Sequence, residues 1–124
     1  MEGLRIDGTR ATFSLSGTQH PDFAADCVRE ALEICRIQGV PELLADLHEV
    51  TPSEAVGLGS RAFYIRDWRK ASGGRVRVAL VVKAELLDPK GFGEKFAQLI
   101  GLQARAFATA AAAAAWLDSL RSSA

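Results

Sequence analysis

Four polar residues that lie close together in the sequence have the side chains that acid–base chemistry or metal binding requires. Asp46, His48 and Glu49 lie at the end of the short apolar run 43–47, and Glu54 follows five residues later. A histidine beside carboxylates can act as a general base or bind a metal ion. The run is typical of a buried parallel strand, and open α/β sheets bind ligands at the carboxyl ends of their strands. We therefore predict a ligand-binding cluster at Asp46, His48 and Glu49; the alternative is a solvated loop in which one acid caps a helix.

The rest of the chain gives catalysis little support, and we predict no enzyme activity and no catalytic residue. No nucleophile partner, glycine-rich phosphate loop or HExxH-type spacing accompanies the cluster. No cysteine or histidine pair has the spacing of metal ligands, so we expect neither a metal site nor a cofactor.

Two cysteines, Cys27 and Cys35, lie eight residues apart on a predicted helix. That separation is about 12 Å along the helix axis, whereas a disulfide needs Cα atoms within about 7 Å. The two thiols therefore cannot bridge each other there. They are interpreted as small buried apolar side chains; the alternative is a redox or nucleophilic thiol, which would need a basic or histidine neighbour.

A basic segment with aromatic residues extends from Arg61 to Arg77. It contains six bases and one acid, a net charge of +5. Arg61, Tyr64 and Trp68 are spaced so that they share one face of a helix, and arginine with large aromatics is over-represented at interfaces. The segment is thus a candidate docking surface for an acidic partner, an anionic ligand or a second subunit. The alternative is a solvated basic face with Trp68 packed against the sheet edge.

The composition favours one globular domain, residues 1–124, and excludes some functions. The 124 residues include 15 basic and 15 acidic side chains, so the formal net charge is zero, and 48% are hydrophobic. Neutrality argues against a general nucleic-acid-binding protein. No apolar run approaches the roughly 20 residues of a membrane span. The start MEGLRIDGTR lacks the apolar stretch of a secretory signal, so we expect a cytoplasmic protein.

Strands and helices are predicted to alternate along the chain in the order ββαβαβαβα. Asp7-Gly8 favours a type I′ hairpin between the first two strands, and the cluster at 51–54 is typical of a helix start. The later elements are a helix from Pro21 to Gly39, a strand over 43–47, a helix from the 51–54 cluster to the glycines at 73–74, a strand over 75–82, a helix from Asp88-Pro89 to Gly101, a strand over 103–108 and an alanine-rich helix capped by Thr109.

This order predicts an α/β fold with a mixed, mostly parallel five-stranded sheet. Several strands alternate between apolar and polar or small residues, although a parallel strand covered on both faces should be apolar throughout. The strand over 75–82 is an example, with Val76, Val78, Leu80 and Val82 on one face and Arg75, Arg77, Ala79 and Val81 on the other. We therefore expect the helices to pack mainly on one face of the sheet, and the simplest arrangement places all of them there.

The segment DLHEVTPSEAVGLG, Asp46 to Gly59, resembles the signature of STAS domains, the family of the bacterial anti-sigma-factor antagonists. The segment from Arg75 to Leu117 is similar to the SpoIIAA-like group of the STAS/SEC14 superfamily. The resemblance implies the same one-sided α/β architecture. The matching residues are Asp46, Leu47, Val50, Gly57, Leu58 and Gly59 in the first segment, with Glu54 where the family has Asp, and Asp88-Pro89, Gly101-Leu102, Phe107, Ala113, Trp116 and Leu117 in the second.

The chain departs from the STAS pattern at the regulatory position. The antagonists carry a serine there, whose phosphorylation controls partner binding, but this chain has Ala55, which has no hydroxyl group. Thr51 and Ser53 are nearby, and a phosphate on either would lie near a helix N-terminus, where backbone N–H groups favour anions. The alternative is that both residues cap the helix.

The leading functional hypothesis is a non-catalytic, regulatory protein-interaction module of a bacterial cytoplasm, which presents the start of its second helix to a partner. The alternative is a small-ligand or lipid-binding domain, as the SEC14 side of the superfamily implies, although so short a chain leaves little room for a separate cavity. A homodimer is also possible, whereas nucleic acid and a membrane span are not expected. The predicted partner-binding residues are Thr51, Ser53, Glu54, Leu58, Arg61, Tyr64 and Trp68.

Overall fold

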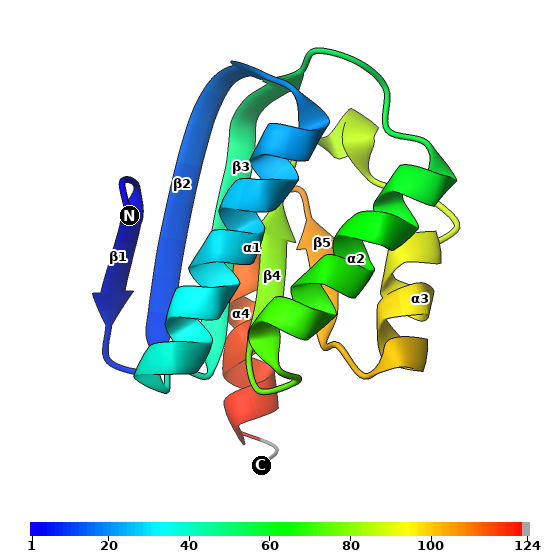
Figure 1. Ribbon diagram of the computed structural model, residues 1–124. Coiled ribbons are helices and arrows are strands. Elements are labelled where there is room, and N and C mark those ends of the chain that lie inside the picture. Colours follow the sequence, from blue (N-terminus) through cyan, green and yellow to red (C-terminus); the bar gives the residue numbers. More distant parts are fainter. Residues whose placement is uncertain (123–124) are drawn as a thin grey trace.

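A computed structural model describes residues 1–122 and shows one five-stranded sheet with four helices (Figure 1). The strands lie in the order β1-β2-β3-β4-β5; β1 is antiparallel to β2, and the other neighbours are parallel. Residues 123–124 of the expected domain lie outside the described part. The elements are β1 (Leu4–Asp7), β2 (Arg10–Gln19), α1 (Pro21–Gln38), β3 (Glu42–Pro52), α2 (Leu58–Ser72), β4 (Arg77–Val81), the 3₁₀ turn η1 (Ala84–Leu86), α3 (Phe92–Ile100), β5 (Ala104–Phe107) and α4 (Ala110–Ser122).

The predicted α/β class, element order and mostly parallel sheet are confirmed. Helices α1, α2 and α3 lie side by side on one face of the sheet (Figure 1). The alternation of β4 has the predicted consequence, because Val78 faces this layer and joins the main core with Phe13, Leu32 and Leu43. Neighbouring Ala79 points to the opposite face and belongs to a second, smaller core.

The expectation that all helices share one face is wrong for α4, which packs on the opposite side (Figure 1). Ala113 and Leu117 of α4 cover Leu44, Ala79 and Val81 of the central strands. These three residues form an apolar area at the centre of the sheet face opposite α1, α2 and α3. The polar residues of the alternating strands lie around this area, so one helix can still pack on it.

Glycines end α1, α2 and α3 where the sequence predicts, but α3 begins later than the predicted Asp88-Pro89: its first residue is Phe92, and Gly91 is its N-cap. Pro21 begins α1, and Gly39, with φ +71°, ends it in the left-handed conformation that glycine adopts without steric cost. The Asp88 side chain accepts the backbone N–H of Phe92 at the start of α3 (N···O 2.9 Å), and Thr109 accepts that of Ala112 in α4 (3.2 Å).

The first hairpin differs from the predicted type I′ turn. Asp7 pairs with Arg10, so the two central turn residues are Gly8 and Thr9. Gly8 has φ +61°, but no non-glycine residue within 1–122 has a positive φ. A type I′ turn needs a positive φ at both central residues, whereas type II′ needs it only at the first, where glycine is preferred.

The third strand is longer than predicted, and the second helix starts later. Strand β3 continues to Pro52 because the long strand β2 pairs with it as far as Gln19. Helix α2 begins only at Leu58, and Gly57 at its N-cap makes no side-chain capping bond. Thr51 is thus a strand residue and Ser53 lies in the following loop, so the expectation that they cap this helix is wrong.

Among the helices that the structure describes, none combines the length and apolar character needed to cross a membrane.

Candidate functional site

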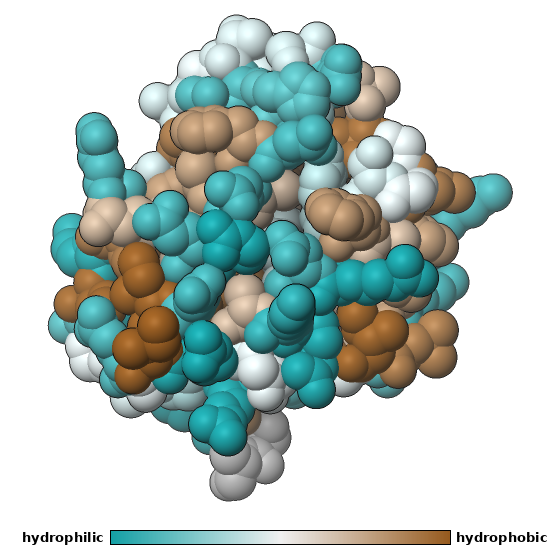
Figure 2. Space-filling model, viewed as in Figure 1, coloured by the Kyte–Doolittle hydropathy of each residue, from teal (hydrophilic) through white to brown (hydrophobic). Residues whose placement is uncertain are grey.

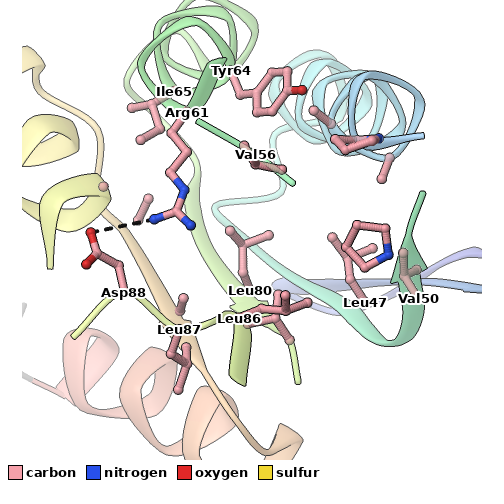
Figure 3. Close-up of a pocket in the computed structure, with 18 of the residues that line it drawn as sticks. Leu47, Val50, Val56, Arg61, Tyr64, Ile65, Leu80, Leu86, Leu87 and Asp88 are labelled. Carbon is pink, nitrogen blue, oxygen red and sulfur yellow. Dashed lines mark ion pairs between the residues drawn. The ribbon is translucent and has the colours of Figure 1, made fainter. Parts of the chain in front are cut away.

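A cavity of about 540 Å³ lies at the carboxyl edge of the parallel strands, on the side of the sheet that carries α1, α2 and α3. Its walls come from the last residue of β2, the far end of β3, the loop before α2, the end of β4, strand β5, turn η1 and the N-terminal parts of α1, α2 and α3 (Figure 3). Ligand pockets of drug-sized molecules measure about 300–1,000 Å³, and open α/β sheets form them at this edge. Both the location and the volume therefore suit a small molecule.

Most of the cavity wall is apolar. The strand alternation that builds the main core continues to this edge, where Leu47 and Leu80 are only partly buried. Turn η1 closes the lower side with two leucines. The apolar side chains labelled in Figure 3 are Leu47 and Val50 of β3, Val56 of the loop, Ile65 of α2, Leu80 of β4, and Leu86 and Leu87 at η1.

Arg61 brings a positive charge into this apolar cavity. It projects from the first turns of α2 toward Asp88, and the nearest side-chain atoms, Nη1 and Oδ2, are 3.6 Å apart (Figure 3). Asp88 also accepts the backbone N–H groups of Lys90 (3.0 Å) and Phe92 (2.9 Å), which with the guanidinium lower the pKa of its carboxyl group. Asp88 therefore stays ionised and holds the start of α3.

Tyr64 and Trp68 form the wall between α2 and α1. The Tyr64 hydroxyl donates to Asp22 (O···O 2.6 Å), and burial together with this bond raises the pKa of Tyr64 to about 12. Trp68 is only 7% exposed, and its indole N–H donates to the carbonyl of Ala25 (2.9 Å). The helix face shared by Arg61, Tyr64 and Trp68, as their spacing predicts, thus lines the cavity.

The other carboxylates of the wall have partners within the protein. Glu54 lies 3.0 Å from Nε2 of His20. The Nδ1 atom of the same imidazole accepts the backbone N–H of Asp22 at the start of α1, which assigns the remaining proton to Nε2. Glu94 lies 3.7 Å from Arg105 and accepts the backbone N–H of Ala106 (3.4 Å).

The predicted cluster Asp46, His48 and Glu49 lies together on β3, but none of its residues lines the cavity. Asp46 accepts the backbone N–H of His48 (3.1 Å), and His48 Nδ1 lies 3.3 Å from Glu49 at the exposed surface. Strand β3 has one more residue than β2 between the pairs Ser14–Asp46 and Ser16–Glu49, so it bulges here. The Asp46 carboxylate thus satisfies a backbone N–H group of the bulge.

Within residues 1–122, no three histidine, cysteine or acidic side chains come close enough together to hold a metal ion. The surroundings of both cysteines fit small apolar side chains better than reactive thiols. Cys35 is buried, and this burial raises the pKa of its thiol to about 11. Burial and nearby acids also raise the pKa of half-buried Cys27.

The predicted partner-binding residues separate into two groups. Thr51, Ser53, Glu54 and Leu58 are exposed, and of these only Glu54 lines the cavity. Arg61 and Tyr64 are half-buried in the cavity wall, and Trp68 is buried there.

The basic segment is likewise not one continuous surface. Arg69 donates to the carbonyl of Ile100 (3.1 Å), Arg77 reaches Glu42 on the back of the sheet, and Arg66 lies over the ring of Phe96.

Sequence reasoning missed the residues that close the cavity from the side of η1 and β4. Leu86 and Leu87 precede Asp88 in a segment for which the sequence predicts no helix or strand. The two adjacent leucines are the signal in the sequence that could have indicated an apolar wall there. Lys83 was also missed. Its ammonium group donates to the carbonyls of His48 (2.7 Å) and Val50 (3.1 Å), where β3 extends beyond β4. It thereby holds the strand segment that forms one wall.

The exposed apolar side chains on the helical face lie apart from one another. The helical face in Figure 2 shows its hydrophobic residues in separate groups between hydrophilic ones. At the start of α2, Leu58 is 58% and Phe63 is 65% exposed. Single exposed apolar residues are normal on protein surfaces, so the cavity is the more distinctive feature.

Comparison with models of known protein families finds no match for this chain, and comparison with curated proteins finds none either. Its function is therefore inferred from the shape and chemistry of the cavity.

Proposed function

We propose that the chain is a non-catalytic binding module whose cavity takes one small, mostly apolar molecule. The cavity at the carboxyl edge of the sheet is the observation that supports this proposal most strongly: about 540 Å³, with aliphatic walls and a few polar groups. This combination is typical of ligand sites. A chain of this length has room for such a cavity, because the edge of the main core and the short turn η1 form its walls and no additional layer of helices or strands is needed.

The polar groups around the cavity support binding rather than catalysis. Among the described residues that line it there is no histidine, cysteine, serine or threonine. Tyr64, with its pKa near 12, is a poor proton acceptor or donor at neutral pH, and Asp88 has a lowered pKa and two backbone bonds to maintain. Efficient acid–base catalysts have pKa values near the working pH.

A titration with an uncharged apolar probe, 1-decanol, tests this proposal. We expect the wild type to bind one molecule per chain and the Val56→Trp variant to lose binding, because the larger side chain at this loop position fills the cavity. Leu99→Trp, which places the same side chain on the outer surface of α3, is the matched control and should bind normally. Equal binding by Val56→Trp and the wild type would contradict the proposal.

A protein-interaction module that presents the start of α2 is the second candidate function. Exposed Leu58 and Phe63 favour it, since apolar side chains of this size are common anchors at interfaces. The element order and the three-helix layer are also compatible with the STAS resemblance. A pull-down from the native host should lose its partner with Leu58→Asp and Phe63→Asp but keep it with Leu99→Asp. Retention of every partner by the double variant would count against this candidate.

A further inference from the structure

The guanidinium of Arg61 has hydrogen-bonding capacity that the protein does not use. It carries five N–H donors, yet within residues 1–122 its side chain makes no hydrogen bond and only one ion pair, with Asp88. The Nη1–Oδ2 distance of 3.6 Å is too long for a hydrogen bond. The side chain is about one-third exposed and points into the cavity from α2 (Figure 3). A polar ligand group would therefore find free donors there.

Asp88 is held at the start of α3 and does not hydrogen-bond these donors. Its Oδ1 accepts the N–H of Lys90 and its Oδ2 that of Phe92, and the carboxylate held in this way lies 3.6 Å from the nearest guanidinium nitrogen. The arrangement keeps a negative charge near the guanidinium but leaves its planar fork free for a second carboxylate, the group that arginine binds best in two-bonded geometry.

The remaining charges around the cavity do not offer an equivalent site. The two other acids of the wall are paired, Glu54 with His20 and Glu94 with Arg105. The guanidinium of Arg105 lies over the ring of Phe107, 5.5 Å from the ring centre. Phe107 packs against the core on the opposite face of the sheet. Arg61 is thus the cation best placed to receive an anionic ligand group beside the aliphatic wall.

We infer that the ligand of the cavity is an amphipathic carboxylate, whose anionic group pairs with Arg61 and whose hydrocarbon part lies against the leucines of β3, β4 and η1. The inference rests on the proposed function and names the class of molecule that would bind. A water molecule occupies about 30 Å³ of liquid, so the cavity of about 540 Å³ has room for roughly 18 non-hydrogen atoms. A medium-chain fatty acid such as decanoate fits within it.

Decanoate and 1-decanol, which share their chain length and differ in charge, provide the test. We expect the wild type to bind decanoate roughly ten- to a hundredfold more tightly than 1-decanol, the range of a charge-assisted hydrogen bond. Arg61→Gln should abolish this preference while leaving the affinity for 1-decanol within about threefold, because only the charged contact is lost. Arg66→Gln, on the same helix but outside the cavity wall, is the matched control and should keep the preference.

A second variant, Asp88→Asn, tests the same pairing in the opposite direction. Asparagine keeps one acceptor oxygen for the backbone N–H groups at the start of α3, but it removes the charge that competes for Arg61, so decanoate should bind at least about threefold more tightly. This variant decides the matter if Arg61→Gln does not fold: unchanged or weaker decanoate binding would overturn the inference. Equal wild-type affinities for the two probes would overturn it too, while leaving the proposed function intact. Failure of both probes to bind would overturn both proposals.

Discussion

Replacement of Glu42 by glutamine should loosen the attachment of α4 to the back of the sheet. Glu42, at the start of β3, is 0% exposed and its carboxylate forms ion pairs with three arginines. Arg10 donates to it at 2.9 Å and Arg77 lies at 3.4 Å, while Arg121 of α4 also donates to its Oε1. Arg10 contacts Asp118 of α4 in addition. The carboxylate thus connects three neighbouring strands with the last helix.

The size of the effect follows from the burial of each partner. Removal of one member of a buried ion pair costs roughly 3–5 kcal/mol, because the remaining charge is left without compensation. Here the Arg10 and Arg77 side chains are about one-fifth exposed and that of Arg121 about half exposed, so water screens part of their repulsion. The glutamine oxygen can also still accept one bond. We therefore expect Glu42→Gln to lower the free energy of unfolding by about 2–3 kcal/mol.

Urea denaturation followed by tryptophan fluorescence measures this loss. The midpoint should fall by about 1–2 M, given the usual dependence of stability on urea. The matched control is Glu49→Gln on the same strand, whose side chain is 78% exposed and which should change stability by less than about 0.5 kcal/mol. A midpoint for Glu42→Gln equal to that of Glu49→Gln would refute the role of Glu42.

Three further predictions concern local features of the fold. The single tyrosine, Tyr64, should keep its proton in the folded protein up to a pH near 12, as ultraviolet absorbance of tyrosinate would report; because the unfolded chain ionises near pH 10, this contribution to stability is present below about 10 and lost as the pH rises toward 12, and native titration near 10 would contradict it. In mildly alkaline buffer, a thiol reagent should label Cys27 slowly and Cys35 only after denaturation, since Cys35 is buried with a pKa near 11; equal rates for both native thiols would contradict this. Gly39→Ala should cost roughly 1–2 kcal/mol of stability because Gly39 has φ +71°, whereas Gly59→Ala, inside α2 and without a positive φ, should be neutral or slightly stabilising in the same denaturation assay.

The fold was predictable wherever the information is local. The alternation of Val78 and Ala79 is visible in the sequence, and it correctly assigned the two sides of β4. The caps at Asp88 and Thr109 and the glycine at 39 act within a few residues, so their signals lie in the sequence next to the helix ends.

The features that the sequence did not reveal depend on distant contacts. Helix α4 is held to the back of the sheet by a contact between Arg121 and Glu42, which are 79 residues apart. The end of β3 was misplaced because its pairing with Gln19 of β2 decides how far the strand continues, and residues 51–54 resemble a helix start. The cavity combines residues of eight elements and of the loops between them, so no single motif predicts it; only the face shared by Arg61, Tyr64 and Trp68 could be anticipated.

Methyl NMR of the protein during titration with decanoate tests the central claim most directly. We expect saturable shifts of the leucine and valine methyls that line the cavity, with those of Leu80, Val82, Leu86 and Leu87 among the largest. The methyls of exposed Leu99 and of Val28, on the buried face of α1 and away from the cavity, should stay unchanged. Shifts centred on exposed Leu58 and Leu99, with the cavity methyls unaffected, would contradict it.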